Sequence, residues 1–488
     1  MLSNPGQLAA TLLLPPAKMD PHESLRGKEL LSLKVEVEPG VQDLESEGRF
    51  GIEELFFSAT NKKGIIASAN AVFARVSGYR LEEMLGKPHN VVRHDDMPRI
   101  TFKLLWDDVA AGRPFAAYVK NRTRRNRHYW VMALVVPISG GYLSVRLNPS
   151  TEHFRVAQGI YSELRALERE IEGPRALGVK PAIAASAERL ESSFAKTPYG
   201  SYDQFIRTAL LAEVRSREEI LRKSGVRAMA GAIPDGELKP AIAAISEVNE
   251  YLRHLVLNLD EYRQLNVELA AKSSHTRDLA DDVRLFALNA IVASSHVTGG
   301  EGAVNAVAEL LSSRSEVMGP RFVALADVVA EVSTLLSDML FPVAAASLQA
   351  EILEIFLREI AARETTATDK RDLAAVQECF ATGLKDLLDI LSRLSERCSG
   401  LGPQVESLRR EMDTMRALSL NGRIESARME DGQTFTALFD TVAQQVETSK
   451  LELEALGRLG QALFTENARD LPRVEAAAAH VSAAIAAA

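Results

Sequence analysis

The spacing of apolar residues changes near residue 150 of this 488-residue chain. Before that point, short apolar runs bounded by turn residues predict strands at 54–60, 65–69, 115–121, 128–137 and 141–147. Helical spacing predicts helices at 71–77, 81–85 and 97–110. This order predicts an α+β domain, a five-stranded antiparallel sheet with helices covering one face.

Beyond residue 150, apolar residues recur every three or four positions, which predicts a mostly α-helical bundle or coiled-coil region. The clearest seam runs from Phe322 to Ile360, and Pro342 within it is expected to kink or split the helix. A second seam, which begins at Leu373, is expected to end at 400–403, where two glycines and a proline occur. A third seam begins at Val405.

These patterns divide the chain into five predicted parts. They are a disordered or flexible tail at 1–48, a sensor domain at 49–150, a helical linker at 151–260, a helical signalling bundle at 261–470 and an alanine-rich helix at 471–488. The tail mixes proline, glycine and acidic residues with isolated apolar patches, a composition typical of disordered segments.

Charge and cysteine content narrow the class of protein. A net charge of -9 argues against general binding to nucleic acid or anionic membranes. Cys379 and Cys398 are the only cysteines, and they lie roughly 28 Å apart on one predicted helix, too far for a disulfide within it. A reducing, cytoplasmic location is therefore expected. The longest apolar stretch, 324–348, contains three acidic residues and a proline, so no membrane span is predicted.

Several motifs occur in order within the sensor domain. They are N-x-x-F at 70–73, SGY at 77–79, GKPHNVVRHDDMP at 86–98, YVKNR at 118–122, YWV at 129–131 and GGYLSVR at 140–146. This series resembles the PAS domains of aerotaxis receptors. The resemblance implies a flavin, FAD, held between sheet and helices, whose redox state reports oxygen or respiratory status.

The resemblance also implies particular cofactor-binding residues. The flavin-associated positions of the family correspond to Asn70, Arg93, His94 and Asp96. The chain departs from the family twice. Asp95 stands where the family's R-H-P-D loop has proline, and Phe115 replaces its usual tryptophan, which keeps an aromatic ring but loses the indole N–H.

A flavin needs aromatic or apolar walls and a few fixed hydrogen-bond partners. The candidates for the walls are Trp106, Phe115, Tyr118 and Trp130, and those for amide partners are Asn70, Asn90 and Asn121. Haem with His94 as ligand is an alternative, because some PAS domains bind haem, but the resemblance favours flavin. A PAS domain without cofactor that serves only dimerisation is a further alternative.

A second signal is a repeated segment in the helical region. RLFALNAIVASS at 284–295 and RALSLNGRIESA at 416–427 share Arg, Leu, Asn and Ser at the same offsets. Each copy predicts a helical hairpin, and in the first copy an insertion at 299–320 precedes the returning helix. Both copies resemble the cytoplasmic tip of methyl-accepting chemotaxis receptors.

This second resemblance implies contacts with the chemotaxis kinase and its coupling protein. The partner-binding candidates are Asn289, Asn421, Glu425 and Arg428. Neither copy keeps the glutamate of the family's A-x-E-V pattern, because Val328 and Thr441 stand there. A receptor tip is a four-helix bundle made by two identical hairpins, so we expect a homodimer or an intrachain pseudo-dimer of the two repeats.

The sequence thus predicts a soluble signal-transduction protein in which a PAS domain reports to a chemoreceptor-like helical output. The alternative is a cofactor-free PAS scaffold that regulates a signalling pathway by docking. An enzyme is not expected, because we find no phosphate-binding glycine loop, nucleophile elbow, metal-ligand spacing or kinase signature.

Overall fold

The computed structural model describes residues 48–173, 178–225, 233–295, 302–362, 367–428 and 433–487. These residues form two compact units. The sheet unit contains those up to Asn249, Ala344–Thr382 and those from Ala484 onward, and the bundle unit contains Glu250–Val343 and Gly383–Ala483. Residues 344–382, predicted as part of the bundle, therefore belong to the sheet unit. Residues 1–47 of the predicted tail lie outside the described residues.

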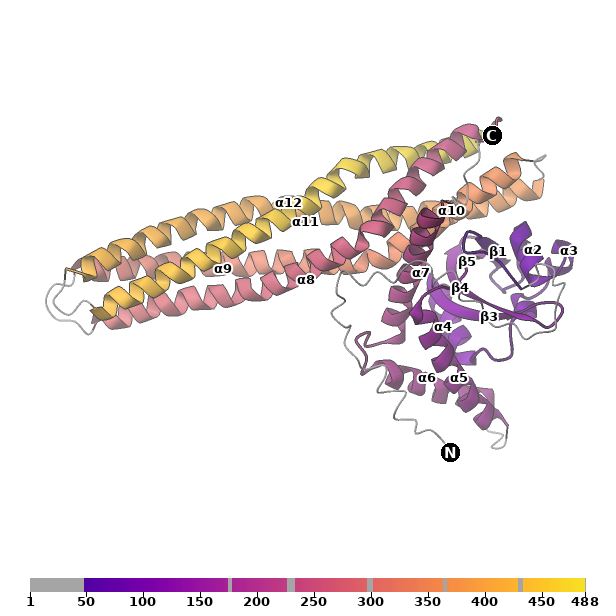
Figure 1. The fold of residues 1–488 in the computed structure, drawn as a ribbon, viewed down its shortest axis with the longest axis horizontal. Coiled ribbons are helices and arrows are strands. Elements are labelled where there is room, and N and C mark those ends of the chain that lie inside the picture. Colours follow the sequence, from indigo (N-terminus) through magenta and orange to yellow (C-terminus); the bar gives the residue numbers. More distant parts are fainter. Residues whose placement is uncertain are drawn as a thin grey trace. The chain divides into compact units, whose positions relative to one another are not determined.

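A five-stranded antiparallel sheet organises the sheet unit (Figure 1). Its strands are β1 (Phe56–Asn61), β2 (Ile66–Ala69), β3 (Phe115–Arg122), β4 (His128–Ile138) and β5 (Gly141–Leu147). They lie in the order β2-β1-β5-β4-β3, so the last strand pairs with the first at the centre of the sheet. The predicted fold class is confirmed, and the strand ends differ from the predicted ones by one or two residues.

Short helices cover the inner face of this sheet. They are α2 (Ala71–Ser77), α3 (Leu81–Met84), the 3-10 helix η2 (His89–Val92) and α4 (Arg99–Ala110). Asn70 begins α2, because its carboxamide oxygen accepts a hydrogen bond from the Phe73 amide. Gly78 ends α2 in the left-handed conformation that glycine adopts without strain. The core beneath these helices includes Phe56, Phe73 and Val131, all fully buried.

The outer face of the sheet is covered as well, although we expected helices on one face only. The helices that follow the sheet are α5 (Glu152–Glu172), α6 (Val179–Phe194) and α7 (Tyr202–Ser224). α7 packs against β3, and Phe356 of α10 (Leu340–Ala361) meets Phe57 edge-on with ring centroids 5.1 Å apart. Leu143, Val145 and Leu147 of β5 point to this face and are fully buried, so the apolar stripe on the outer face of β5 required a second cover.

The bundle unit consists of two antiparallel helical hairpins (Figure 1). Their helices are α8 (Lys239–Ser295), α9 (Gly302–Asp338), α11 (Ala367–Ser426) and α12 (Gln433–Ala487). Within the first hairpin, Asn266 donates a hydrogen bond to Ser337 over 2.9 Å. Ion pairs within the second hairpin join Asp413–Lys450, Arg416–Glu447 and Arg423–Asp440. An ion pair of 3.1 Å between Arg314 and Glu411 joins α9 to α11, so both hairpins of one chain lie side by side.

Two predictions about helix ends in this region are wrong. α11 continues through 400–403, because Cys398, Leu401 and Val405 extend its buried stripe across that segment. Residues 302–320, expected to be an insertion, belong to α9, and Pro320 lies inside that helix. In both helices the burial of an apolar stripe outweighs the loss of one backbone hydrogen bond.

The split expected at Pro342 is present. α9 ends at Asp338 and α10 begins at Leu340, so Pro342 lies in the first turn, where a missing N–H has no helical acceptor to lose. The alanine-rich segment expected as a separate helix is instead the last part of α12, which runs to Ala487.

Cys379 and Cys398 both lie on α11, as predicted, and both are buried free thiols. Burial raises the pKa of Cys398 to about 12, and it raises the pKa of Cys379 as well. Both side chains therefore stay protonated at neutral pH and act as small apolar core residues.

One stretch of the described residues, Gly302–Ala361, is long and apolar enough to cross a membrane by length and composition alone. It comprises α9 and α10, and 83% of its most apolar window is buried inside the protein. Packing within the helical core accounts for that apolar character.

We expect Gly141→Ala to destabilise the sheet unit and Gly140→Ala to leave it almost unchanged. A Cβ atom at Gly141 would lie 1.9 Å from the backbone oxygen of Thr60, whereas nothing lies within 4 Å of one at Gly140. Overpacking of this kind costs about 1–3 kcal/mol or more. Urea unfolding followed by tryptophan fluorescence reports on this unit, which holds both tryptophans, and equal stability of the two variants would contradict the expectation.

Candidate functional site

A cavity of about 260 Å³ lies between the inner face of the sheet and the segment from η2 to α4. Its apolar and aromatic lining comes from Phe102, Leu105, Trp106, Val119, Ala133, Val135 and Tyr142. Its uncharged polar lining includes Ser58, Asn90, Asn121 and Ser144, and its basic lining is Lys63, His89, Arg93 and Arg146. None of the residues that line it is acidic.

Strand alternation and one loop bring these side chains together. On β5, Tyr142, Ser144 and Arg146 line the cavity, while the intervening leucine and valine residues point to the outer face. The loop after η2 is held at the edge strand β3, where Arg93 pairs with Asn121 in a short antiparallel bridge. The cavity therefore has a rigid wall made by the sheet and an opposite wall made by η2 and α4.

Arg146 is the most buried charge of the cavity, with 3% of its surface exposed. Its guanidinium donates hydrogen bonds to the hydroxyl of Ser58 over 2.9 Å and to Nε2 of His89 over 2.7 Å. It also lies 4.9 Å from the ring centroid of Phe73. Burial lowers the pKa of Arg146 to about 10, so it remains a cation at neutral pH.

His89 does not share that charge. Burial, together with the charge of Arg146, lowers the pKa of His89 to about 3, so the ring is neutral and Nε2 accepts the hydrogen bond. The ring also stacks on Phe73 with centroids 5.9 Å apart. A neutral histidine thus orients the guanidinium and leaves its positive charge in place.

Asn121 contributes a buried amide. The residue is 3% exposed, its nitrogen Nδ2 makes no hydrogen bond of normal geometry, and its side chain interacts with the hydroxyl of Tyr129 on the neighbouring strand. A buried donor left unpaired costs about 1–3 kcal/mol. A ligand with an acceptor atom in the cavity would remove that cost, so the donor set fits a polar-edged aromatic cofactor such as flavin.

Of the ten candidate cofactor-binding residues, four line the cavity: Asn90, Arg93, Trp106 and Asn121. The guanidinium carbon of Arg93 lies 3.7 Å from the ring centroid of Phe102, and burial lowers the pKa of Arg93 to about 10. Trp106 is 42% exposed and meets Tyr142 edge-on, with ring centroids 5.5 Å apart.

Asn70 and Phe115 do not line the cavity. The carboxamide of Asn70 accepts from the amides of Phe57 and Phe73 and donates to the carbonyl of Leu55, so its hydrogen bonds serve the fold. Phe115 is buried at the start of β3. The assignment of both residues to cofactor binding stays a prediction.

His94 and Asp96 lie behind the cavity wall, in the loop that leads into α4. Nδ1 of His94 accepts a hydrogen bond from the Asp96 amide, and burial lowers the pKa of His94. Lys120 and Arg169 donate hydrogen bonds to the Asp96 carboxylate and hold its pKa at about 2. These two predicted residues therefore face β3 and α5, where they connect the loop to the rest of the unit.

The sequence analysis missed Ser58, His89 and Arg146 as parts of the site. A signal for Arg146 was present, because it lies on β5 opposite the stripe of Leu143 and its neighbours and so had to point inward. No pattern in the sequence indicated that the side chain of His89 would contact Arg146, which is 57 residues further along the chain.

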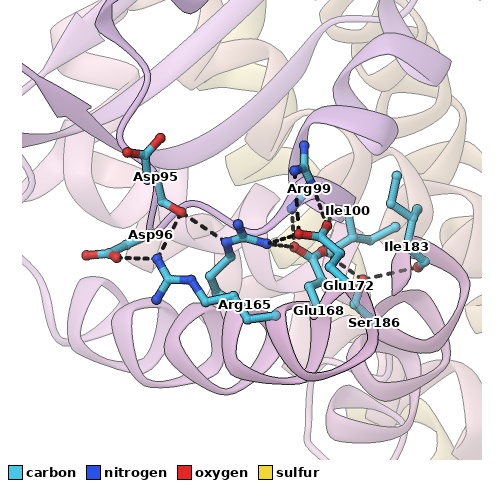
Figure 2. Close-up of polar contacts among 10 residues, drawn as sticks. Asp95, Asp96, Arg99, Ile100, Arg165, Glu168, Glu172, Ile183 and Ser186 are labelled. Carbon is cyan, nitrogen blue, oxygen red and sulfur yellow. Dashed lines mark hydrogen bonds and ion pairs between the residues drawn. The ribbon is translucent and has the colours of Figure 1, made fainter. Parts of the chain in front are cut away.

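Glu168 links the helical wall of the cavity to α5, which we call the exit helix because it leaves the sheet after β5 (Figure 2). Its fully buried carboxylate accepts hydrogen bonds from the backbone amides of Arg99 over 2.8 Å and Ile100 over 3.1 Å, the first two residues of α4. The Ser186 hydroxyl donates to it over 2.9 Å, and Arg165 lies 3.3 Å away. A carboxylate from a helix far along the chain thus caps α4 and complements its dipole.

The same exit helix holds the loop that precedes α4. Arg165 donates to the backbone oxygen of Asp95 over 2.9 Å, and Arg169 donates to the carboxylate of Asp96 over 2.9 Å (Figure 2). Any shift of this loop or of α4 therefore acts directly on α5.

A second buried carboxylate, Glu213 of α7, holds the start of α5. It accepts hydrogen bonds from the backbone amide of Ser150 over 2.6 Å and from the hydroxyl of Thr151 over 2.7 Å. It also accepts one from the Tyr118 hydroxyl on β3 over 2.7 Å. Sheet, exit helix and α7 meet at this one side chain.

The predicted partner-binding residues lie near the ends of two helices of the bundle unit. Asn421 of α11 and Arg428, in the turn just after that helix, are exposed, and Glu425 of α11 forms an ion pair of 2.8 Å with Arg428. Asn289 lies on α8, and its side chain is outside the described residues.

The repeats share one further property. Leu288 and Val292 of the first copy are 48% and 54% exposed, and their counterparts Leu420 and Ile424 are 39% and 52% exposed. Each repeat therefore presents an exposed apolar pair one helical turn apart.

A sheet of this topology over a ligand-sized cavity defines a PAS-type sensor domain, and the family model described as PAS fold matches residues 66–144. This part of the chain is similar to the aerotaxis receptor of Escherichia coli (strain K12), with 40% identity over 114 residues. The resemblance to an aerotaxis-receptor PAS domain is confirmed, and the helical remainder fits a receptor-like output. The match spans 22% of this chain and 22% of that receptor.

We expect Glu168→Gln to lower the free energy of unfolding of the sheet unit by about 2–3 kcal/mol, because a buried charged acceptor of several hydrogen bonds is lost. The amides of Arg99 and Ile100 should exchange faster with deuterium. The matched control is Glu163→Gln on the same helix, since Glu163 is half-exposed and its ion pair is long, at 3.7 Å. Unchanged exchange at α4 in the Glu168 variant would contradict the capping role.

Proposed function

We propose that this protein is a signal transducer whose PAS domain holds FAD and reports redox or oxygen status to a chemoreceptor-like helical output. The observation that carries the proposal is the cavity, which combines aromatic walls, a buried amide and basic side chains without any carboxylate among its lining residues. The similarity to a protein named as an aerotaxis receptor supports the same role and a non-enzymatic one.

The size of the cavity supports a flavin bound by its ring system alone. Its volume of about 260 Å³ lies just below the usual 300–1,000 Å³ of ligand pockets, so we infer that the rest of the dinucleotide would lie outside. Phe102 and Trp106 on α4 and Val119 on β3 provide apolar walls, and Asn121 provides a hydrogen bond to a polar ring edge. When bound, the flavin would supply reversible electron transfer, and the protein would supply orientation and charge.

The contacts around α4 support a route from the cavity to the output. Phe102 and Trp106 belong to the same helix whose first amides bind Glu168, so a shift of the wall changes the contacts of α5. From α7, Arg217 forms a buried bidentate ion pair with Glu351 of α10 over 2.7 and 2.8 Å. α10 is the helix that follows α9 of the bundle in the chain.

The exposed apolar pairs of the two repeats support a docking role for this output. These pairs are about half exposed at equivalent positions of the two repeats, and the resemblance to receptor tips makes the chemotaxis kinase and coupling protein the proposed partners. Because both hairpins come from one chain, a single molecule would present two such pairs.

We expect the purified protein to show the two visible absorption bands of an oxidised flavin and to lose them on reduction with dithionite. Trp106→Leu should weaken flavin retention by roughly three- to tenfold, because one aromatic wall is lost. Trp130→Leu is the matched control, since Trp130 lies on the outer face against Phe154 and Tyr161.

Other spectra would redirect the proposal. A Soret band would replace flavin with haem. A protein that stays colourless after flavin and haem are supplied would overturn redox sensing and favour the cofactor-free docking scaffold.

We expect the double variant Leu420→Ser, Ile424→Ser to bind purified chemotaxis coupling protein at least about tenfold more weakly than the unmodified chain, because apolar contact area is lost from the interface. Leu451→Ser is the matched control, because Leu451 is 58% exposed on α12 and lies outside both repeats. Isothermal calorimetry measures each affinity, and no binding by the unmodified chain would remove the proposed partner.

A further inference from the structure

The guanidinium of Arg146 is a buried charge that the fold itself does not neutralise. Its hydrogen-bond partners are the hydroxyl of Ser58, the carbonyl of Ser144 and the ring of His89, all of them uncharged. No ion pair to Arg146 occurs among the described residues. A buried charge without a counter-ion is costly, and proteins keep one where it serves a bound ligand or a reaction.

The groups around Arg146 keep its charge available. Burial and the neighbouring guanidinium hold His89 on η2 neutral, with a pKa of about 3. Tyr129 on β4 is buried, and burial raises its pKa, so it too stays uncharged. Arg93 and Lys63 also line the cavity, and no acidic residue does. Every charged group that faces the cavity is therefore positive.

We propose that Arg146, held by Ser58 and His89, is an anion-binding subsite of the cavity that stabilises the negative charge a flavin acquires when it is reduced. The proposal rests on the proposed function. An oxidised flavin that takes two electrons and one proton carries one negative charge, whereas two electrons and two protons leave it neutral. The electrons come from a reductant outside the protein, and dithionite supplies them in the test. Arg146 favours the reaction with one proton, because its charge attracts the anion.

The measurable consequence is a pH dependence of the flavin's midpoint potential. The steepness of that dependence gives the number of protons taken up with two electrons. This number falls from two to one as the pH rises through the pKa of the reduced flavin. We expect Arg146→Met to raise the pKa of the reduced flavin, which corresponds to roughly tenfold or stronger proton binding. At pH values above that pKa, the variant should have a lower midpoint potential. Arg146→Lys keeps the positive charge and should retain most of the native behaviour.

The experiment is a dye-coupled redox titration of the flavin-loaded protein with dithionite, repeated between about pH 5.5 and 8.5. In this range the charge states of Arg146, Arg93 and His89 stay constant, because the two arginines have pKa values of about 10 and His89 has one of about 3. Arg80→Met is the matched control, because it removes an arginine whose side chain is 78% exposed. It should leave the pKa of the reduced flavin unchanged.

The possible outcomes separate this inference from the proposed function. A pKa shift in Arg146→Met that is absent from Arg80→Met and small in Arg146→Lys supports the subsite. A flavin that binds but titrates alike in all variants overturns the subsite alone. An unmodified chain that retains no flavin overturns both proposals. If Arg146→Met does not fold, the unmodified protein still decides, because its reduced flavin must have a lower pKa than free flavin.

Discussion

The buried carboxylate of Glu168 is the contact on which the arrangement of the sensor domain depends. It satisfies two of the amides that every helix leaves unpaired at its start, here those of Arg99 and Ile100. Because this cap comes from α5 rather than from the preceding loop, α4 keeps its place only while the exit helix keeps its own. The wall of the cavity and the first element of the output are thus one structural unit.

Two walls of very different rigidity enclose the cavity. The sheet wall contains β5, which is paired along its length with β1 on one side and β4 on the other, so it cannot move without breaking two ladders. The opposite wall, η2 and α4, is attached by separate contacts, which include the bridge at Arg93, the cap at Glu168 and the hydrogen bond from Arg146 to His89. It is the helical wall that is connected to α5.

Local patterns predicted the fold well, because each strand and short helix of the domain carries its own periodicity and stop signals. They failed where packing between distant segments decided the outcome. Pro320 and the segment 400–403 contain residues that usually end helices, yet buried stripes such as Leu401 continue through them. The site shows the same division. Arg93 follows from the motif and Trp106 from the need for an aromatic wall, whereas the contact between His89 and Arg146 arises only from the way the sheet folds against η2.

The positions of the cavity's two guanidinium groups fit the proposed redox sensing. Arg146 lies on the sheet wall, on a strand paired on both sides. Arg93 lies beside Phe102 in the helical wall, next to the loop that Arg165 and Arg169 hold. In the proposed sensing, negative charge on a reduced cofactor would attract both groups, and a response of the helical wall would reach α5 through these contacts.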